Sequence, residues 1–185
     1  MASLRTTSSA PAAPTYLDLD EVPAAKRAGT WSRAADLYFP GLAARVPVTA
    51  RQGQLRGIRC GAGMLWQIDS PPLQLAWSPR HRLDGEQRFS VLVQLGGTTT
   101  ARQHDRSCSI RRDDICFLDQ NTPFELEVSQ GSSQLMVLQL PRATVLGRNP
   151  WLEHRTAETL DPSDPGALLL RGMLLNLLTL APSLN

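Results

Sequence analysis

The segment 89–143 constrains the fold of this chain more than any other part of it. It reads as five short strands separated by tight turns, and no helical run interrupts them. Short apolar segments with this spacing are typical of an antiparallel sheet that closes into a small barrel or sandwich. Such a barrel can enclose one ligand, yet this segment carries no evident catalytic set.

Glycine, proline and paired polar residues mark the ends of the predicted strands. The residues upstream of position 89 predict a strand, a turn and a second strand, then an alternating strand after two prolines. The expected strand regions are 55–69, 73–79, 89–95, a hairpin over 98–110, 115–118, 124–128 and 134–140. The fold class is therefore mostly β, as a cupin-like antiparallel β-barrel of the jelly-roll type with flanking helices.

The two ends of the chain differ from this central region. Residues 1–15 are rich in small residues and proline, which predicts a flexible leader. A short helix capped by Thr30 is expected over 31–38, ended by proline and glycine. We therefore divide the chain into a leader (1–15), a barrel with an N-terminal helical segment (16–147), and a linker with a C-terminal helix (148–185).

The C-terminal helix is predicted to be amphipathic and to begin at Ser163-Asp164-Pro165. Its apolar residues follow the 3–4 spacing of a heptad seam, and further leucines widen the stripe. So broad a face predicts contacts with the barrel on one side and with a second copy or a following domain on the other. The alternative is a helix that only covers its own sheet. The candidate dimerisation residues are Leu170, Met173, Leu177 and Leu180.

Composition indicates a globular protein that does not itself bind nucleic acid. Hydrophobic residues make up 42% of the chain and charged residues 19%, and the net charge is only +2. The arginines are scattered, so no stripe suited to a phosphate backbone is present. The odd number of cysteines, without a CxxC spacing, favours free thiols in the cytoplasm. The apolar stretch 167–181 is too short to span a membrane.

Catalytic chemistry finds little support in the sequence. A metal-dependent cupin needs two or three histidines and a carboxylate around one ion. The three histidines, His81, His104 and His154, are dispersed and share no His-x-His spacing. There is no Gly-x-Ser-x-Gly elbow and no cysteine with an evident histidine partner. We therefore expect no metal, no cofactor and no enzymatic activity.

The order of motifs from residue 89 onward resembles the cupin-like regulatory domain of AraC/XylS-type transcription regulators. The matching residues are Gly96, Gln103, Asp114, Asp119, Pro123-Phe124 and Leu140-Pro141-Arg142. Asp113 departs from the pattern, because the family usually has glycine there. The resemblance covers about 45–147. It implies an effector-binding and dimerisation module, with helix-turn-helix motifs beyond Asn185 that bind DNA, and a leader that folds over the barrel mouth.

The barrel interior is predicted from strand alternation and from this resemblance. Along 124–128, Glu125 and Glu127 must face water, so Phe124 and Leu126 face inward. Alternation also places Val93 with Leu95, and the family's inward positions place Gln134 with Met136. The candidate ligand-binding residues are Trp66, Trp77, Val93, Leu95, Phe124, Leu126, Gln134 and Met136.

This interior is apolar and aromatic and carries no fixed charge, which favours a hydrophobic or aromatic effector. The expected function is effector sensing and homodimerisation within a transcription regulator. Two alternatives remain open: a dimerisation module with a packed, ligand-free core, and a cupin-fold enzyme.

Overall fold

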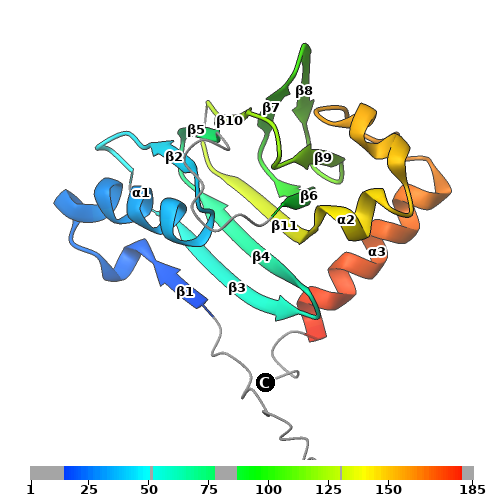
Figure 1. Ribbon diagram of the computed structural model, residues 1–185. Helices are drawn as coiled ribbons and strands as arrows, with labels where there is room; N and C mark the ends of the chain where they lie inside the picture. The colour runs from blue at the N-terminus through cyan, green and yellow to red at the C-terminus, as the bar shows by residue number, and fades with distance from the viewer. Residues whose placement is uncertain (1–14, 51, 78–86, 130, 181–185) are drawn as a thin grey trace, which may run out of the picture.

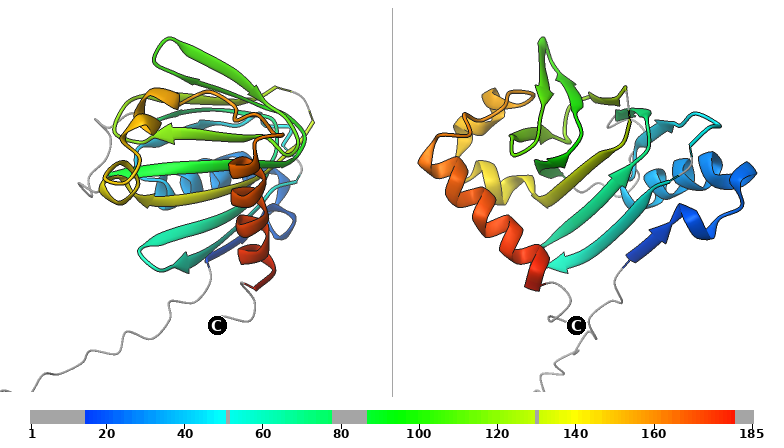
Figure 2. Two further views of the ribbon diagram at one scale, coloured as in Figure 1. Left: turned by 90° about the vertical axis from the view of Figure 1, so that its right-hand side faces the viewer. Right: turned by 180° about the vertical axis from the view of Figure 1, so that it is seen from behind.

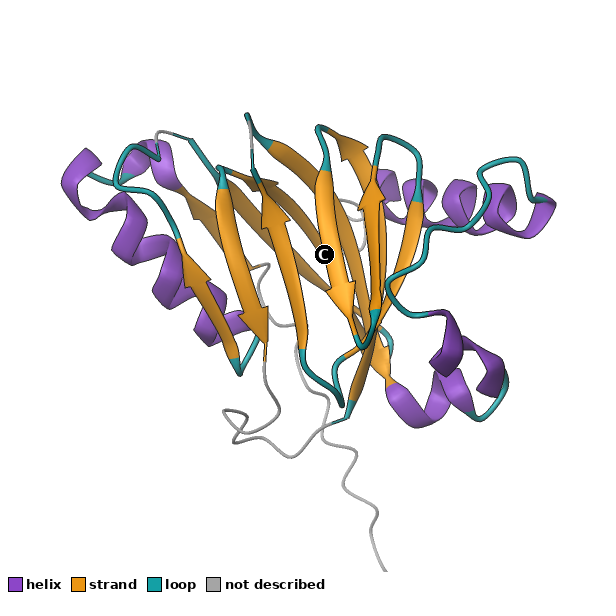
Figure 3. Ribbon diagram, turned by 90° about the horizontal axis from the view of Figure 1, so that it is seen from above, coloured by secondary structure: helices purple, strands orange, loops and turns teal. Residues whose placement is uncertain are grey.

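Two antiparallel sheets pack face to face in the computed structural model, which describes residues 15–50, 52–77, 87–129 and 131–180. Figures 1 and 3 show the two layers, with helices at both sides. This sandwich confirms the predicted fold class, with mostly β structure, two antiparallel sheets and few helices.

The larger sheet has six strands in the order β1-β3-β4-β11-β6-β9. Its central strands are the longest ones, and β11 lies between β4 and β6 although these come much earlier in the chain. The strands are β1 (Thr15–Asp18), β3 (Gln54–Cys60), β4 (Gly63–Ser70), β6 (Arg88–Gly96), β9 (Ile115–Asp119) and β11 (Ser133–Pro141).

The smaller sheet has five strands in the order β2-β5-β10-β7-β8. It contains β10, whose predicted alternation is confirmed, with Glu125 exposed and both Phe124 and Leu126 buried. The strands are β2 (Leu42–Arg45), β5 (Leu73–Trp77), β7 (Thr99–Gln103), β8 (Arg106–Ile110) and β10 (Phe124–Val128).

The helices lie at two sides of the sandwich (Figure 2). The N-terminal α1 (Arg27–Tyr38) follows the short turns η1 (Leu19–Glu21) and η2 (Ala24–Lys26), and lies near β2 and the β1–β3 edge. The other helical segments, α2 (Arg142–Leu146), η4 (Pro150–Arg155) and α3 (Pro165–Leu180), follow β11. None of the helices in the described ranges is long and apolar enough to cross a membrane.

Helix α1 begins earlier than predicted, at Arg27, and Thr30 is not its cap. Instead the Thr30 hydroxyl accepts a bond from Arg33 within the helix. The turn η2 leads directly into α1, so its first residues need no separate capping signal at position 30. Strands β1 and β2 were also not predicted. Each has only four residues, too few to show an alternation.

Two separate apolar clusters form the core. The first, cluster 1, lies between the sheets and includes Leu92, Val137 and the α1 residue Trp31. The second, cluster 2, lies on the other face of the larger sheet and includes Met136 of β11 and Leu174 of α3. The larger sheet is therefore buried on both faces, and this explains why β6 and β9 read as continuous apolar runs.

Positive φ angles show where the turns depend on special backbone conformations. Gly97 has φ +71°, and a Cβ there would lie 2.1 Å from the carbonyl oxygen of Ser132. Asp113, the departure from the family pattern, also takes a positive φ of 76°. Aspartate tolerates this region better than most residues do. The turn therefore keeps the geometry that glycine would favour. The Asp113 carboxylate forms an ion pair with Arg171 of α3, with 2.9 Å between Asp113 Oδ1 and a terminal guanidinium nitrogen.

A buried ion pair joins the ends of β9 and β11. Arg142 Nε donates to Asp119 Oδ2 at 2.9 Å, and the Asp119 side chain is only 3% exposed. The Gln103 amide fixes the same corner, donating to the carbonyl of Asp119 at 2.7 Å and accepting from its N–H at 3.0 Å. Three residues of the family pattern thus have a structural role at this corner.

We expect Arg142→Leu to lower the free energy of unfolding by about 2–4 kcal/mol, because it leaves the Asp119 carboxylate buried without its cation. Urea titration followed by circular dichroism measures this change. Arg148→Leu, at an exposed position just beyond α2, is the matched control. An equal loss in both variants would contradict the assigned role of the ion pair.

Candidate functional site

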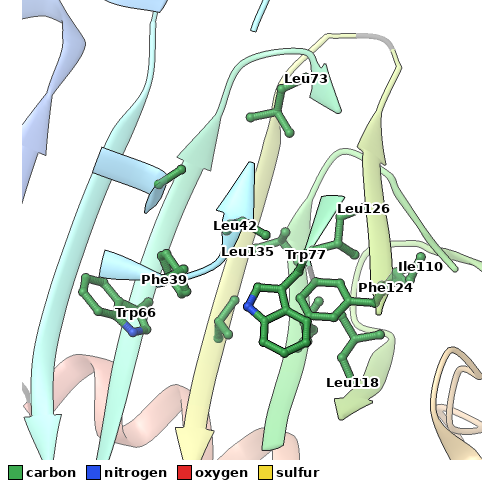
Figure 4. Packing of buried hydrophobic residues seen from close by; sticks show 14 of the residues in the cluster. Phe39, Leu42, Trp66, Leu73, Trp77, Ile110, Leu118, Phe124, Leu126 and Leu135 are labelled. Atoms are coloured by element: carbon green, nitrogen blue, oxygen red, sulfur yellow. The ribbon is translucent and has the colours of Figure 1, made fainter. Parts of the chain in front are cut away.

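A cavity of about 70 Å³ lies between the two sheets. Its walls come from both sheets, and one side is covered by Trp31 and Ala35 of α1 and by Phe39, the residue after this helix. The remaining apolar lining consists of Leu42, Leu55, Ile68, Leu73, Leu75, Trp77, Leu92, Leu118, Phe124, Leu126, Val128, Leu135 and Val137. Figure 4 shows several of these side chains converging between the strands.

Aromatic rings stack at the centre of the cavity wall. Trp77 of β5 and Phe124 of β10 are register partners, and their rings stack with centroids 5.5 Å apart and an interplanar angle of 8°. The indole Nε1 of Trp77 donates to the carbonyl oxygen of Pro40 at 3.0 Å, just after α1. The ring that lines the cavity is thus connected directly to the end of the covering helix.

Four polar side chains reach the cavity: Ser70, Ser90, Thr99 and Gln120. Gln120 Nε2 donates to Ser90 Oγ at 2.8 Å. Because Ser90 accepts this bond, its hydroxyl proton can be donated into the cavity. Among the described lining residues none is charged. The lining therefore offers apolar contacts together with a few neutral hydrogen-bonding groups.

A chain of buried amides supports this polar group. Trp66 Nε1 donates to Gln139 Oε1 at 2.9 Å, and Gln139 Nε2 donates to Gln120 Oε1 at 3.3 Å. Gln139 is 4% exposed and Gln120 6%, so each amide depends on its neighbour for partners. The network orients Gln120 and with it the Ser90 hydroxyl.

Three of the predicted ligand-binding residues line the cavity: Trp77, Phe124 and Leu126. Trp66 is on the inner face, where it is the register partner of Val137. It packs against Phe39, with ring centroids 4.9 Å apart, and is not part of the lining. Figure 4 shows these two rings apart from the Trp77–Phe124 pair.

The predicted orientation of β6 and β11 was wrong. Val93 and Met136 are fully buried, but in cluster 2 on the outer face, and the half-buried Leu95 packs against the same cluster. Gln134 is exposed. Because both faces of these strands are apolar, their alternation carried no sign of which face is inside, and the assumed register was displaced by one residue.

Sequence reasoning missed the residues that do face inward from these strands, Ser90, Leu92, Leu135 and Val137. A signal was available in β6. Ser90 and Gln94 are its polar residues within an apolar run, and they share one face of the strand. Polar residues on a buried strand indicate a face with hydrogen-bonding partners, and that face is the inner one.

The predicted dimerisation residues divide between two faces of α3. Leu170 and Leu177 are half-buried against cluster 2, beside the fully buried Leu174. Met173 is 53% exposed, and the neighbouring Leu169 is 76% exposed. The side chain of Leu180 lies outside the described residues. The helix therefore packs on its own sheet with one face and leaves a second apolar face uncovered in the single chain.

The described residues contain no group of three or more His, Cys, Asp or Glu side chains close enough to share a metal ion. His104 and His154 are both exposed, on a hairpin turn and in η4. His81 lies outside the described residues.

One family model matches most of the chain. The sequence profile of the AraC-binding-like domain matches residues 35–185. The crystal structure of the AraC-like transcriptional activator CuxR superposes with a TM-score of 0.76 at 15% identity, over 92% of this chain and 63% of CuxR. The chain thus spans less than two thirds of that regulator.

A second solved structure, a cupin domain of an XRE family transcriptional regulator from Enterobacter cloacae, gives a TM-score of 0.39 at 8% identity, over 54% of this chain and 96% of that one. No curated protein sequence matches the chain.

Asp69 of β4 gives a pH-dependent test of the larger sheet. Its Oδ1 is buried without a partner among the described residues. Burial raises the pKa of this carboxyl, and a hydrogen bond to Gln134 opposes the shift. A raised pKa means that the folded chain binds the proton more tightly than the unfolded chain does. The stabilising contribution is therefore present at low pH and lost as the pH rises through the folded pKa.

We expect Asp69→Asn to raise the free energy of unfolding at pH 7, because the amide removes the buried charge. The gain should shrink as the pH falls through the raised folded pKa, and it should be lost once the pH is below the usual carboxyl value of 3.8. Denaturant titrations at several pH values measure the difference, with Asp36→Asn at an exposed site of α1 as the control. A gain that grows toward low pH would have the wrong sign.

Proposed function

Because the chain belongs to the AraC-binding-like domain family, we propose that it senses a small hydrophobic or aromatic effector in the cavity between its sheets. The family consists of effector-binding and dimerisation domains of transcription regulators and not of enzymes. The observation that carries the proposal is the cavity lined by Trp31, Trp77 and Phe124, with Ser90 and Gln120 as its polar groups.

The chemistry of the lining supports a neutral ligand with an aromatic ring. An apolar enclosure with a few placed polar groups is typical of small-molecule sites. A carboxylate or ammonium would have to lose its hydration without a charged partner among the described lining residues, which is costly. A phenol or an uncharged aromatic amide could instead bond to Ser90 and Gln120 and stack on Trp77.

The volume of the cavity indicates that binding changes the structure. An apolar cavity of about 150 Å³ is known to hold benzene, so about 70 Å³ is too small for an aromatic effector. Helix α1 is the element best placed to move away from the cavity when a ligand binds. It supplies one wall, and among the described residues its side-chain bond to β2 runs from Ser32 Oγ to the carbonyl of Ala44 at 2.9 Å.

An effector therefore shifts the protein toward the arrangement in which α1 is displaced, provided that it binds this arrangement more tightly. The Trp77–Pro40 bond connects the ligand side of the wall to the end of α1. In a regulator, such a shift would pass to DNA-binding motifs in a further segment, and we propose that the whole protein acts in the cytoplasm.

The ligand is tested by a thermal-shift screen of phenols, aromatic amides, aromatic amines and aromatic acids. A ligand at one hundred times its dissociation constant is expected to stabilise the fold by about 2.7 kcal/mol, and to change the fluorescence of Trp31 and Trp77.

We expect Val137→Phe, which fills the cavity from β11, to weaken binding at least about tenfold while circular dichroism shows a folded chain.

Met136→Leu is the matched control, because Met136 is the next residue on the same strand and faces cluster 2. It should keep the affinity of the parent chain. Equal effects of both substitutions would contradict binding between the sheets.

The small volume of the cavity also favours the second candidate function, a dimerisation module with a packed core. The absence of any thermal shift across the ligand screen would support this function.

For dimerisation we propose the exposed face of α3, centred on Leu169 and Met173. These residues are four positions apart and therefore neighbours on the helix surface. A second copy of this chain would cover them, in keeping with the dimerisation role of the family. Of the residues predicted from the heptad spacing whose side chains the structure describes, only Met173 is on this exposed face.

We expect the double variant Leu169→Glu with Met173→Glu to raise the dimer dissociation constant by about ten- to a hundredfold, because it places charges in an apolar contact. Analytical ultracentrifugation measures this constant. Leu37→Glu, at a leucine of α1 that is 69% exposed, is the control. A parent chain that stays monomeric, or a double variant that dimerises unchanged, would contradict the proposed interface.

A further inference from the structure

Two cysteines face each other where the edges of the two sheets meet. Cys108 lies on β8, the edge strand of the smaller sheet, and Cys116 lies on β9, the edge strand of the larger one. Their Sγ atoms are 3.8 Å apart. Figure 1 shows β8 and β9 beside the segment that leads toward α3. The pair plays no part in the proposed ligand site.

The two thiols differ in access to solvent. Cys116 is fully buried in cluster 1 beside Ala157, whereas Cys108 is half-buried at the margin of this cluster. A small oxidant can therefore reach Cys108 first. Cys116 is behind it, at the distance at which a second thiol can attack.

The hydrogen bond between the two thiols also separates their reactivities. The bond from Cys116 lowers the pKa of Cys108, against burial and the nearby carboxylates of Asp114 and Glu158. The same bond, together with burial, raises the pKa of Cys116. Cys108 is therefore the thiol that ionises first, and the thiolate is the nucleophilic form.

We propose that Cys108 and Cys116 form an oxidant-sensitive dithiol, which hydrogen peroxide converts into an intramolecular disulfide between the two sheets. Cys108 thiolate attacks one peroxide oxygen, the O–O bond breaks, and hydroxide leaves and takes a proton to become water. Cys108 is then a sulfenic acid. Cys116 attacks the Cys108 sulfur, its thiol proton leaves with the sulfenic oxygen as a second water, and the S–S bond forms.

Closing the disulfide requires a movement of the edge strands. The Sγ atoms must approach from 3.8 Å to about 2.05 Å. Strand β9 is anchored to β6 within the larger sheet, whereas β8 is paired only with β7 among the described strands. The β7–β8 hairpin is therefore the part that moves toward β9.

This movement reaches the segment 156–160, which precedes α3. Arg106 of β8 donates to Thr156 twice, from Nε to the carbonyl at 2.6 Å and from a terminal nitrogen to Oγ1 at 2.8 Å. On the other side, Leu160 N–H donates to the carbonyl of Ile115 at 2.9 Å. The segment thus bridges β8 and β9, and oxidation would fasten it between them.

The experiment treats the full 185-residue chain with hydrogen peroxide and digests it with trypsin under non-reducing conditions. Arg111 and Arg112 separate the two cysteines, so a disulfide appears as peptides 107–111 and 113–142 joined, lighter than the reduced pair by two hydrogen atoms. Cys60→Ser should give the same product at the same rate. Cys108→Ser should slow the loss of Cys116 thiol by at least about tenfold.

Cys116→Ser removes the resolving thiol, so dimedone should label a sulfenic acid on Cys108 in this variant. Amide hydrogen exchange over 156–160 should be slower in the oxidised chain than in the reduced chain. The proposal fails if peroxide oxidises Cys60 before Cys108, if the disulfide joins two chains, or if exchange over 156–160 does not change.

Discussion

The structure depends on the burial of the larger sheet on both of its faces. One face meets the smaller sheet and α1 around the cavity, and the other lies beneath α2, η4 and α3. Adjacent residues such as Met136 and Val137 therefore belong to different cores and, by our proposal, to different functions. Only the thickness of this one sheet separates a substitution on one face from the residues on the other face.

This arrangement places the polar groups of the interior where water does not reach them. Trp66 of β4, Gln139 of β11 and Gln120, in the turn after β9, satisfy one another, and Gln120 in turn donates to the Ser90 hydroxyl that lines the cavity. A partly satisfied network would be costly in so apolar a setting. The same amides that stabilise the core therefore determine which ligand atoms the proposed site could accept.

The corner formed by β8 and β9 has a different character from the cavity. It joins the sheets through side chains and through the segment 156–160, and not through a strand ladder of its own. The closest thiols of the chain lie at this point. Oxidation at this corner would act on the segment that leads to α3, whereas ligand binding in the cavity would act on α1. The two proposed signals therefore act on opposite sides of the sandwich.

Part of the structure was predictable from the order of strands and turns. The seven regions expected to be strands correspond to β3 to β11, and the ends of β6, β10 and β11 were close to those expected. The family pattern was also informative, although Gln103, Asp119 and Arg142 prove to hold a corner together and do not line the cavity. In β10 the alternation of Phe124 and Glu125 identified the inner face, because one side of that strand meets water.

The sequence by itself thus determined the sandwich, the position of the C-terminal helix and the inner face of β10, whose other side meets water. Only the tertiary structure decided the inner face of β6 and β11, since α3 covers their other side and burial there leaves no polar alternation to read. It also decided which residues of α3 stay exposed and that Cys108 meets Cys116. These are contacts between elements far apart or on different sheets, and a local pattern of residues does not encode them.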